Sequence, residues 1–147
     1  ALSNKNQKVS FFQDTITSAT GNICGSDKTW IENYLGTNAS KISIETKRLD
    51  SFKGEELFPS LIKIDVEGHE LEVLEGAEAI IAQVKPIMII ESFPPKQMNV
   101  LNFLYQFGYK VYDADQYSAI NNNTLNLFAW HPCGPLQEKV LQEVINT

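Results

Sequence analysis

The sequence predicts an α/β protein with a mostly parallel sheet and an antiparallel last strand. Two short apolar runs, residues 61–66 and 86–91, have the composition of buried parallel strands. A segment with apolar residues three and four positions apart lies between them, as in a helix with one apolar face. The last apolar run, residues 125–130, follows a connection too short for a parallel crossover, which favours an antiparallel return.

Length and charge limit the class of protein. The 147 residues carry 18 Asp and Glu against 12 Lys and Arg, a net charge of −6. A chain of this length is typical of a single domain, here residues 1–147. Its acidity and the lack of a Lys/Arg-rich segment argue against nucleic acid as a partner. The two cysteines, Cys24 and Cys133, form no C-x-x-C pair, so the sequence has no zinc motif.

Targeting signals are also lacking in the sequence. No apolar run reaches the 18 residues of a membrane span, and the first residues are polar, unlike a secretory signal. We therefore expect a soluble cytoplasmic protein without a membrane partner.

The first third of the chain predicts two strands separated by a long loop. Residues 8–12 and 41–46 show the alternation and β-branched or aromatic content of half-buried strands, which we expect to pair with each other. Residues 14–40 between them are rich in Asn, Ser, Thr and Gly and predict a functional or mobile loop.

The remaining elements follow in order. Residues 61–66 predict a buried strand, residues 70–84 a helix broken or kinked at Gly76, and residues 86–91 a second strand. Pro94 and Pro95 suit the first turn of a second helix that ends at Gly108. Residues 109–112 then predict a third strand, and residues 134–147 a C-terminal amphipathic helix. We expect the second helix to turn these side chains inward: Met98, Leu101, Leu104 and Tyr105.

Two sequence blocks resemble a known family. The strand, helix, strand and antiparallel return resemble the C-terminal half of a class I S-adenosylmethionine-dependent methyltransferase. LIKIDVEGHELEVLEGA at residues 61–77 and KPIMIIE at residues 85–91 resemble the signature block of FkbM-type methyltransferases. ALS at residues 1–3 and RLDSF at residues 48–52 extend the resemblance, which covers residues 1 to 130. It implies a class I methyltransferase-like (Rossmann-like) fold.

One part of the family pattern is absent. In the family, a glycine-rich loop approaches the methionine end of the cofactor, and an acidic residue after the second strand holds the ribose. This sequence has no G-x-G-x-x-G, and residues 21–28 lack the spacing of a phosphate loop. We therefore expect a truncated domain whose N-terminal cofactor-binding half is missing and which is inactive alone.

Three carboxylates are candidates for catalysis. Asp65, Glu67 and Glu91 follow predicted parallel strands, and open α/β sheets bind ligands beyond the carboxyl ends of their strands. Methyl transfer needs an acceptor held in line and its proton removed, so Asp65 is expected to orient or deprotonate a hydroxyl. The alternatives are that Asp65 accepts backbone hydrogen bonds and that Glu67 caps the following helix.

His69 and the carboxylates also raise the questions of a general base and of a metal site. His69 is a candidate general base, because its charge changes near neutral pH, or else a surface or capping residue. Asp65 and Glu91 can in principle hold a divalent cation, but carboxylates on neighbouring strand ends commonly occur without one, so we expect no metal. Lys63, within the strand, needs a partner or a route to solvent.

Binding residues follow from the resemblance. Leu2 and Ser3 match the region that lines the adenine in the family, which implies a cofactor-binding role, although a chain start at Ala1 predicts fraying. Trp30, Tyr34 and Trp130 are candidates for acceptor contact or for ordinary core packing.

The sequence is compatible with two functions. The resemblance implies an S-adenosylmethionine-dependent methyltransferase acting on a hydroxyl of a carbohydrate or small secondary metabolite. The rival is a non-catalytic remnant that serves as an association or folding module. It would self-associate through the exposed sheet edge at residues 61–66.

Overall fold

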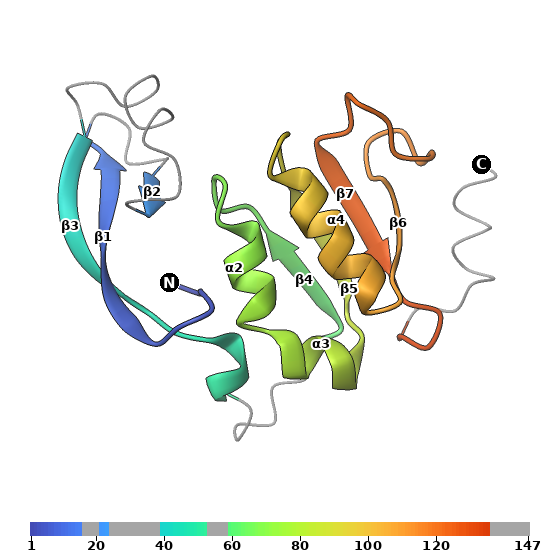
Figure 1. The fold of residues 1–147 in the computed structure, drawn as a ribbon, viewed down its shortest axis with the longest axis horizontal. Helices are drawn as coiled ribbons and strands as arrows, with labels where there is room; N and C mark the ends of the chain where they lie inside the picture. The colour runs from blue at the N-terminus through green and yellow to red at the C-terminus, as the bar shows by residue number, and fades with distance from the viewer. Residues whose placement is uncertain (16–20, 24–38, 53–58, 136–147) are drawn as a thin grey trace.

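The computed structural model describes residues 1–15, 21–23, 39–52 and 59–135, which form two sheets and helices that pack on one of them (Figure 1). One sheet is antiparallel with strand order β2-β1-β3, and the other is mixed with strand order β4-β5-β7-β6. Residues 136–147, most of the expected C-terminal helix, lie outside the described residues, as do Cys24, Trp30 and Tyr34.

The smaller sheet confirms the two strands expected in the first third of the chain. β1 (Gln7–Asp14) pairs antiparallel with β3 (Ala39–Thr46) along its whole length, and β2 (Gly21–Ile23) pairs with the other side of β1. A short 3-10 helix, η3 (Leu49–Phe52), then leads toward the second sheet.

The mixed sheet confirms the antiparallel last strand. β4 (Leu61–Ile64) runs parallel to β5 (Ile87–Glu91), and β7 (Asn126–Trp130) lies antiparallel between β5 and β6 (Lys110–Asp113). β4, β5 and β6 therefore point the same way, as strand–helix–strand units with right-handed crossovers require. Their carboxyl ends lie at one edge of the sheet.

Three helices cover one face of this sheet (Figure 1). α2 (Glu70–Glu75) and α3 (Glu78–Val84) connect β4 to β5, and α4 (Gln97–Gln106) connects β5 to β6. The expected helix break is confirmed: Gly76 ends α2 and packs so closely on the N-terminal segment that a Cβ there would lie 2.0 Å from the carbonyl oxygen of Ser3. The core lies between sheet and helices and includes Ile64, Leu74, Ile81, Met88, Ile90, Leu104 and Leu127.

Two expectations about burial and helix phase are wrong. The strand expected at residues 61–66 ends at Ile64, and its Leu61 side chain is 55% exposed, because β4 pairs only with β5 among the described residues. Met98 and Tyr105 of α4 are 59% and 52% exposed. The helix begins at Gln97, after both prolines, and its buried face is formed by these residues: Gln97, Val100, Leu101, Phe103 and Leu104.

The N-terminal segment is anchored, contrary to the expected fraying. The Ser3 amide donates to the Lys47 carbonyl at 3.0 Å, and the Lys47 amide donates to the Ala1 carbonyl at 2.9 Å. The Ala1 ammonium group also donates to the Glu45 carbonyl at 2.8 Å. These backbone contacts with the end of β3 hold the first three residues in place.

The described helices were compared with the length and apolarity of a membrane span. Within residues 1–15, 21–23, 39–52 and 59–135, no helix combines the length and the apolarity needed to cross a bilayer.

Candidate functional site

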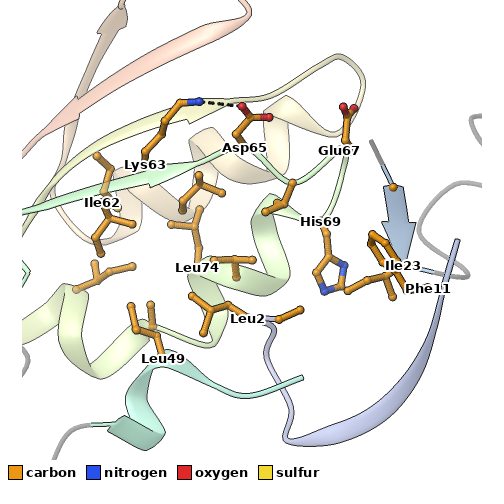
Figure 2. Close-up of a pocket in the computed structure, with 18 residues that line it drawn as sticks. Leu2, Phe11, Ile23, Leu49, Ile62, Lys63, Asp65, Glu67, His69 and Leu74 are labelled. Carbon is orange, nitrogen blue, oxygen red and sulfur yellow. Dashed lines mark hydrogen bonds and ion pairs between the residues drawn. The ribbon is translucent and has the colours of Figure 1, made fainter. Parts of the chain in front are cut away.

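A cavity of about 450 Å³ opens beside β4, between the mixed sheet with its helices and the smaller sheet (Figure 2). Most of its wall is apolar and comes from β4, α2, α3, β1 and η3. The polar lining residues gather where β4 ends: Lys63, Asp65, Glu67 and His69. The structure thus brings three of the four sequence-predicted catalytic residues into one wall, at the carboxyl edge where α/β sheets bind ligands.

Asp65 is held by a charge partner next to the end of β4. The Lys63 ammonium donates to the Asp65 carboxylate at 2.8 Å, a contact that Figure 2 shows as a dashed line. This hydrogen bond lowers the pKa of Asp65 and raises the pKa of Lys63. Lys63 is exposed at the sheet edge. It therefore has both a charge partner, Asp65, and access to solvent, the two alternatives that the sequence left open.

Glu91 ends β5, the strand paired with β4, and reaches the same edge. Burial raises its pKa, and the neighbouring Asp65 carboxylate raises it further by charge repulsion and by a hydrogen bond. Asp65 is therefore the ionised member of the pair and Glu91 the member that protonates first. In the described residues, no group of three or more His, Cys, Asp or Glu side chains is arranged to hold a metal ion.

Glu67 stands on a tight turn rather than on the helix. Its φ is 50° and that of Gly68 is 88°, both in the left-handed region. Burial raises the pKa of Glu67, and the carboxylates of Asp65 and Glu91 add to the effect. The helix-capping alternative is wrong, because α2 has His69 at its N-cap position and no side-chain cap.

His69 is buried, so the surface alternative is wrong, and although it occupies the N-cap position of α2, its side chain makes no capping hydrogen bond. Its Nε2 lies 2.9 Å from the Ser3 hydroxyl oxygen, and its ring faces Phe11 and Ile23 in Figure 2. Nδ1 has no hydrogen-bond partner among the described residues and lies 3.6 Å from the Glu72 carboxylate. Burial lowers the pKa of His69, so the ring is neutral near pH 7.

The two cofactor-binding candidates occupy different positions. Leu2 lines the cavity (Figure 2). Ser3 is only 3% exposed and contacts His69 instead. Trp130 is 1% exposed, so an acceptor contact by this residue is wrong: it belongs to β7, an inner strand of the sheet.

Three residues at the site were not predicted from the sequence: Asn22, Glu70 and Lys96. Each contacts the backbone of the turn at residues 67–68. Glu70 lies two positions after Gly68, and an acidic residue at a helix start is a local signal that could have identified it. Asn22 and Lys96 lie 45 and 28 residues away from their contacts, and no local pattern indicates such pairs.

Comparisons with known proteins place this chain in a family. A family model described as the methyltransferase FkbM domain matches residues 1–111. The crystal structure of the methyltransferase FkbM from Methylobacillus flagellatus KT is similar at 22% identity and a TM-score of 0.48, over 60% of this chain and 24% of that chain. No curated protein matches. Because the family model covers 111 of the 147 residues, this chain belongs to the family of methyltransferase FkbM domains.

Proposed function

We propose that this domain takes part in methyl transfer from S-adenosylmethionine to a hydroxyl group of a carbohydrate or small secondary metabolite. The observation that carries the proposal is the Asp65–Glu91 carboxyl pair at the end of two parallel strands beside the cavity. Family membership supports the reaction class. The antiparallel β7 between β5 and β6 supports a class I methyltransferase-like (Rossmann-like) arrangement.

The residues around the cavity fit the chemistry of S-adenosylmethionine. The volume of about 450 Å³ lies in the range of small-molecule pockets, roughly 300–1,000 Å³. The cofactor carries a sulfonium and an ammonium group, and the carboxylates at the mouth of the cavity complement positive charge. Leu2 and the apolar wall are suited to the adenine ring. When bound, the cofactor supplies an electrophilic methyl group.

The chain's own side chains supply acceptor positioning and proton removal in this proposal. Asp65, kept ionised by Lys63, accepts the hydrogen bond that orients the acceptor hydroxyl. The carboxylate of Glu91, whose pKa is raised, is the stronger base of the pair and takes the proton. The His69 ring, which lines the same cavity and is neutral near pH 7, is a second proton acceptor in this proposal.

Binding of the donor is tested by NMR. We expect millimolar S-adenosylmethionine to shift the amide resonances of Asp65, Glu67 and His69, and S-adenosylhomocysteine, which lacks the sulfonium charge, to shift them less. Glu91→Gln should weaken the binding of the charged donor, whereas Asp115→Asn in the exposed connection between β6 and β7 should not. No shifts at the cavity, or equal shifts with both compounds, would contradict this assignment.

Methyl transfer itself needs a separate assay. Because the sequence contains no G-x-G-x-x-G loop, we propose that this chain binds the donor weakly and is inactive alone. Adding the glycine-rich half of another FkbM methyltransferase as a separate polypeptide should restore transfer of radioactive methyl groups to a hydroxylated acceptor pool. Transfer that survives Asp65→Asn and Glu91→Gln together would reject the proposed roles.

The second candidate function is that of an association module, and the free side of β4 favours it. Among the described residues β4 pairs with β5 alone, and Leu61 projects from it with 55% of its side chain exposed. An edge strand of this kind offers unpaired backbone groups to another strand. Sedimentation tests this candidate, because an association module forms dimers without any ligand, and a monomer would contradict it.

A further inference from the structure

The turn at residues 67–68 requires an unusual backbone. Glu67 and Gly68 both have positive φ angles, and a non-glycine residue in that region is held at a cost of about 1 kcal/mol or more. The turn lies between Asp65 on one side and His69 on the other. Its conformation therefore sets where the Glu67 carboxylate and the His69 ring lie at the mouth of the cavity.

Side chains from three separate elements bind the backbone of this turn. Asn22 of β2, only 1% exposed, donates from its Nδ2 to the Glu67 carbonyl at 2.6 Å. The Glu70 carboxylate at the start of α2 accepts from the Gly68 amide at 2.7 Å. Lys96, directly before α4, donates from its Nζ to the Gly68 carbonyl at 3.1 Å. Two consecutive peptide groups are thus fixed from three directions.

We propose that Lys96 is a positioning residue that fixes the turn at residues 67–68 from the β5–α4 side and thereby sets the places of Glu67 and His69. Its ammonium group packs directly on Gly68, where an added Cβ would lie 3.1 Å from Nζ. The contact joins the segment after β5, which follows Glu91, to the segment after β4, which follows Asp65. This contact therefore fixes the segments that follow β4 and β5 relative to each other.

The charge of Lys96 also acts on the site. Two charged groups face His69: Glu72 on its own helix raises the pKa of the ring, and Lys96 lowers it, in addition to the larger effect of burial. The Ser3 hydroxyl, which contacts the ring at Nε2, carries no charge. Lys96 therefore favours a neutral His69 as well as a fixed turn. That this serves catalysis rests on the proposed function.

The test uses the unliganded chain and two readouts at the site. Lys96→Met keeps most of the stem and removes the charge and the donor, Lys96→Arg keeps both, and Lys41→Met on exposed β3 is the matched control. Amide hydrogen exchange is measured at residues 67–69 and in β5, and the His69 ring is titrated by NMR.

We expect Lys96→Met to accelerate exchange at residues 67–69 at least tenfold while β5 is unchanged, and to raise the pKa of His69. Lys96→Arg should restore both readouts, and Lys41→Met should alter neither. Wild-type values in Lys96→Met, or equal acceleration in β5, would overturn the proposal. If Lys96→Met does not fold, the scalar coupling between Nζ and the Gly68 carbonyl in the unsubstituted chain decides the matter. Neither readout involves a methyl donor, so failure here is distinct from failure of the proposed function.

Discussion

The pKa values of two neighbouring carboxyl groups, Asp65 and Glu91, shift in opposite directions because their surroundings differ. Asp65 receives a hydrogen bond from the Lys63 ammonium, which lowers its pKa. For Glu91, burial and repulsion by Asp65 outweigh the smaller lowering effect of Lys63 and raise its pKa. Pairs of titratable groups whose pKa values are driven apart are typical of acid–base sites.

Asp65→Asn tests how the charge of Asp65 affects its neighbours. Removal of the negative charge should lower the pKa of Glu91 and the pKa of Lys63, because Asp65 raises both. Titration of the Glu91 side-chain carbon by NMR measures the first effect. In a reconstituted enzyme, kcat and kcat/KM should fall together by about 100-fold or more, with donor affinity little changed. An unaltered Glu91 titration, or wild-type rates in the folded variant, would give Asp65 a structural role.

At the scale of elements, local periodicity predicted most of the fold and long-range contacts explain what it missed. Spacings of two and of three to four residues identified both sheets' main strands and the helices with the break at Gly76, since those patterns express the backbone geometry itself. The prediction that Met98 and Tyr105 are buried was wrong, because around the helix axis these two residues lie at the border of the face of α4 that is buried. The Ser3–His69 contact spans 66 residues, beyond any sequence pattern.

Gly76 supplies a prediction about how α2 meets the N-terminal segment. Its φ of −73° suits any residue, so Gly→Ala would ordinarily stabilise a helix by up to about 1 kcal/mol. A Cβ here would lie 2.0 Å from the Ser3 carbonyl, so we expect Gly76→Ala to lower the free energy of unfolding by about 1–3 kcal/mol. Urea unfolding measures it. In a chain without residues 1–4 the same substitution should be neutral or stabilising, and equal losses in both backgrounds would contradict the explanation.

The connection between β6 and β7 provides a prediction about pH. Asp113 accepts a hydrogen bond from the Thr124 hydroxyl and two more from the amides of Asp115 and Gln116, and these bonds, that of Thr124 foremost, lower its pKa. A carboxyl with a lowered folded-state pKa stabilises the fold above its unfolded pKa of about 3.9, and that contribution is lost as the pH falls through the folded pKa. Thr124→Val should therefore lower Tm more at pH 6 than at pH 2, as measured by circular dichroism. Ser118→Ala, whose hydroxyl does not reach Asp113, is the control, and a difference independent of pH would contradict the assignment.

For the whole molecule, we expect association at the side of β4 away from β5, which pairs with no other strand among the described residues. We propose self-association through an antiparallel pairing of β4 with β4 of a second copy, centred on Ile64. That register preserves the faces of both sheets and places Lys63 opposite Asp65 of the second copy, a favourable cross-strand pair worth about 0.2–1 kcal/mol. Both side chains lie on the exposed side of the strand end.

Charge reversal tests this pairing by sedimentation equilibrium. Lys63→Glu and Asp65→Lys should each weaken the dimer, since each places like charges opposite one another, and the double variant should restore it. Lys8→Glu on β1 is the matched control for net charge. A wild-type monomer, or a double variant as weak as the singles, would contradict the pairing. Micromolar binding of S-adenosylmethionine to such a monomer by calorimetry would also contradict the weak donor binding that we propose.

The anchoring of Ser3 to His69 has a consequence for the order in which the domain folds. The hydrogen bond closes a loop of 66 residues, whereas the β4–β5 unit with its helices is built from contacts much closer along the chain. Loop-closure entropy must be overcome before so distant a contact contributes, and distant contacts slow folding. We therefore expect the wall that carries His69 to be completed after the sheet beneath it has formed.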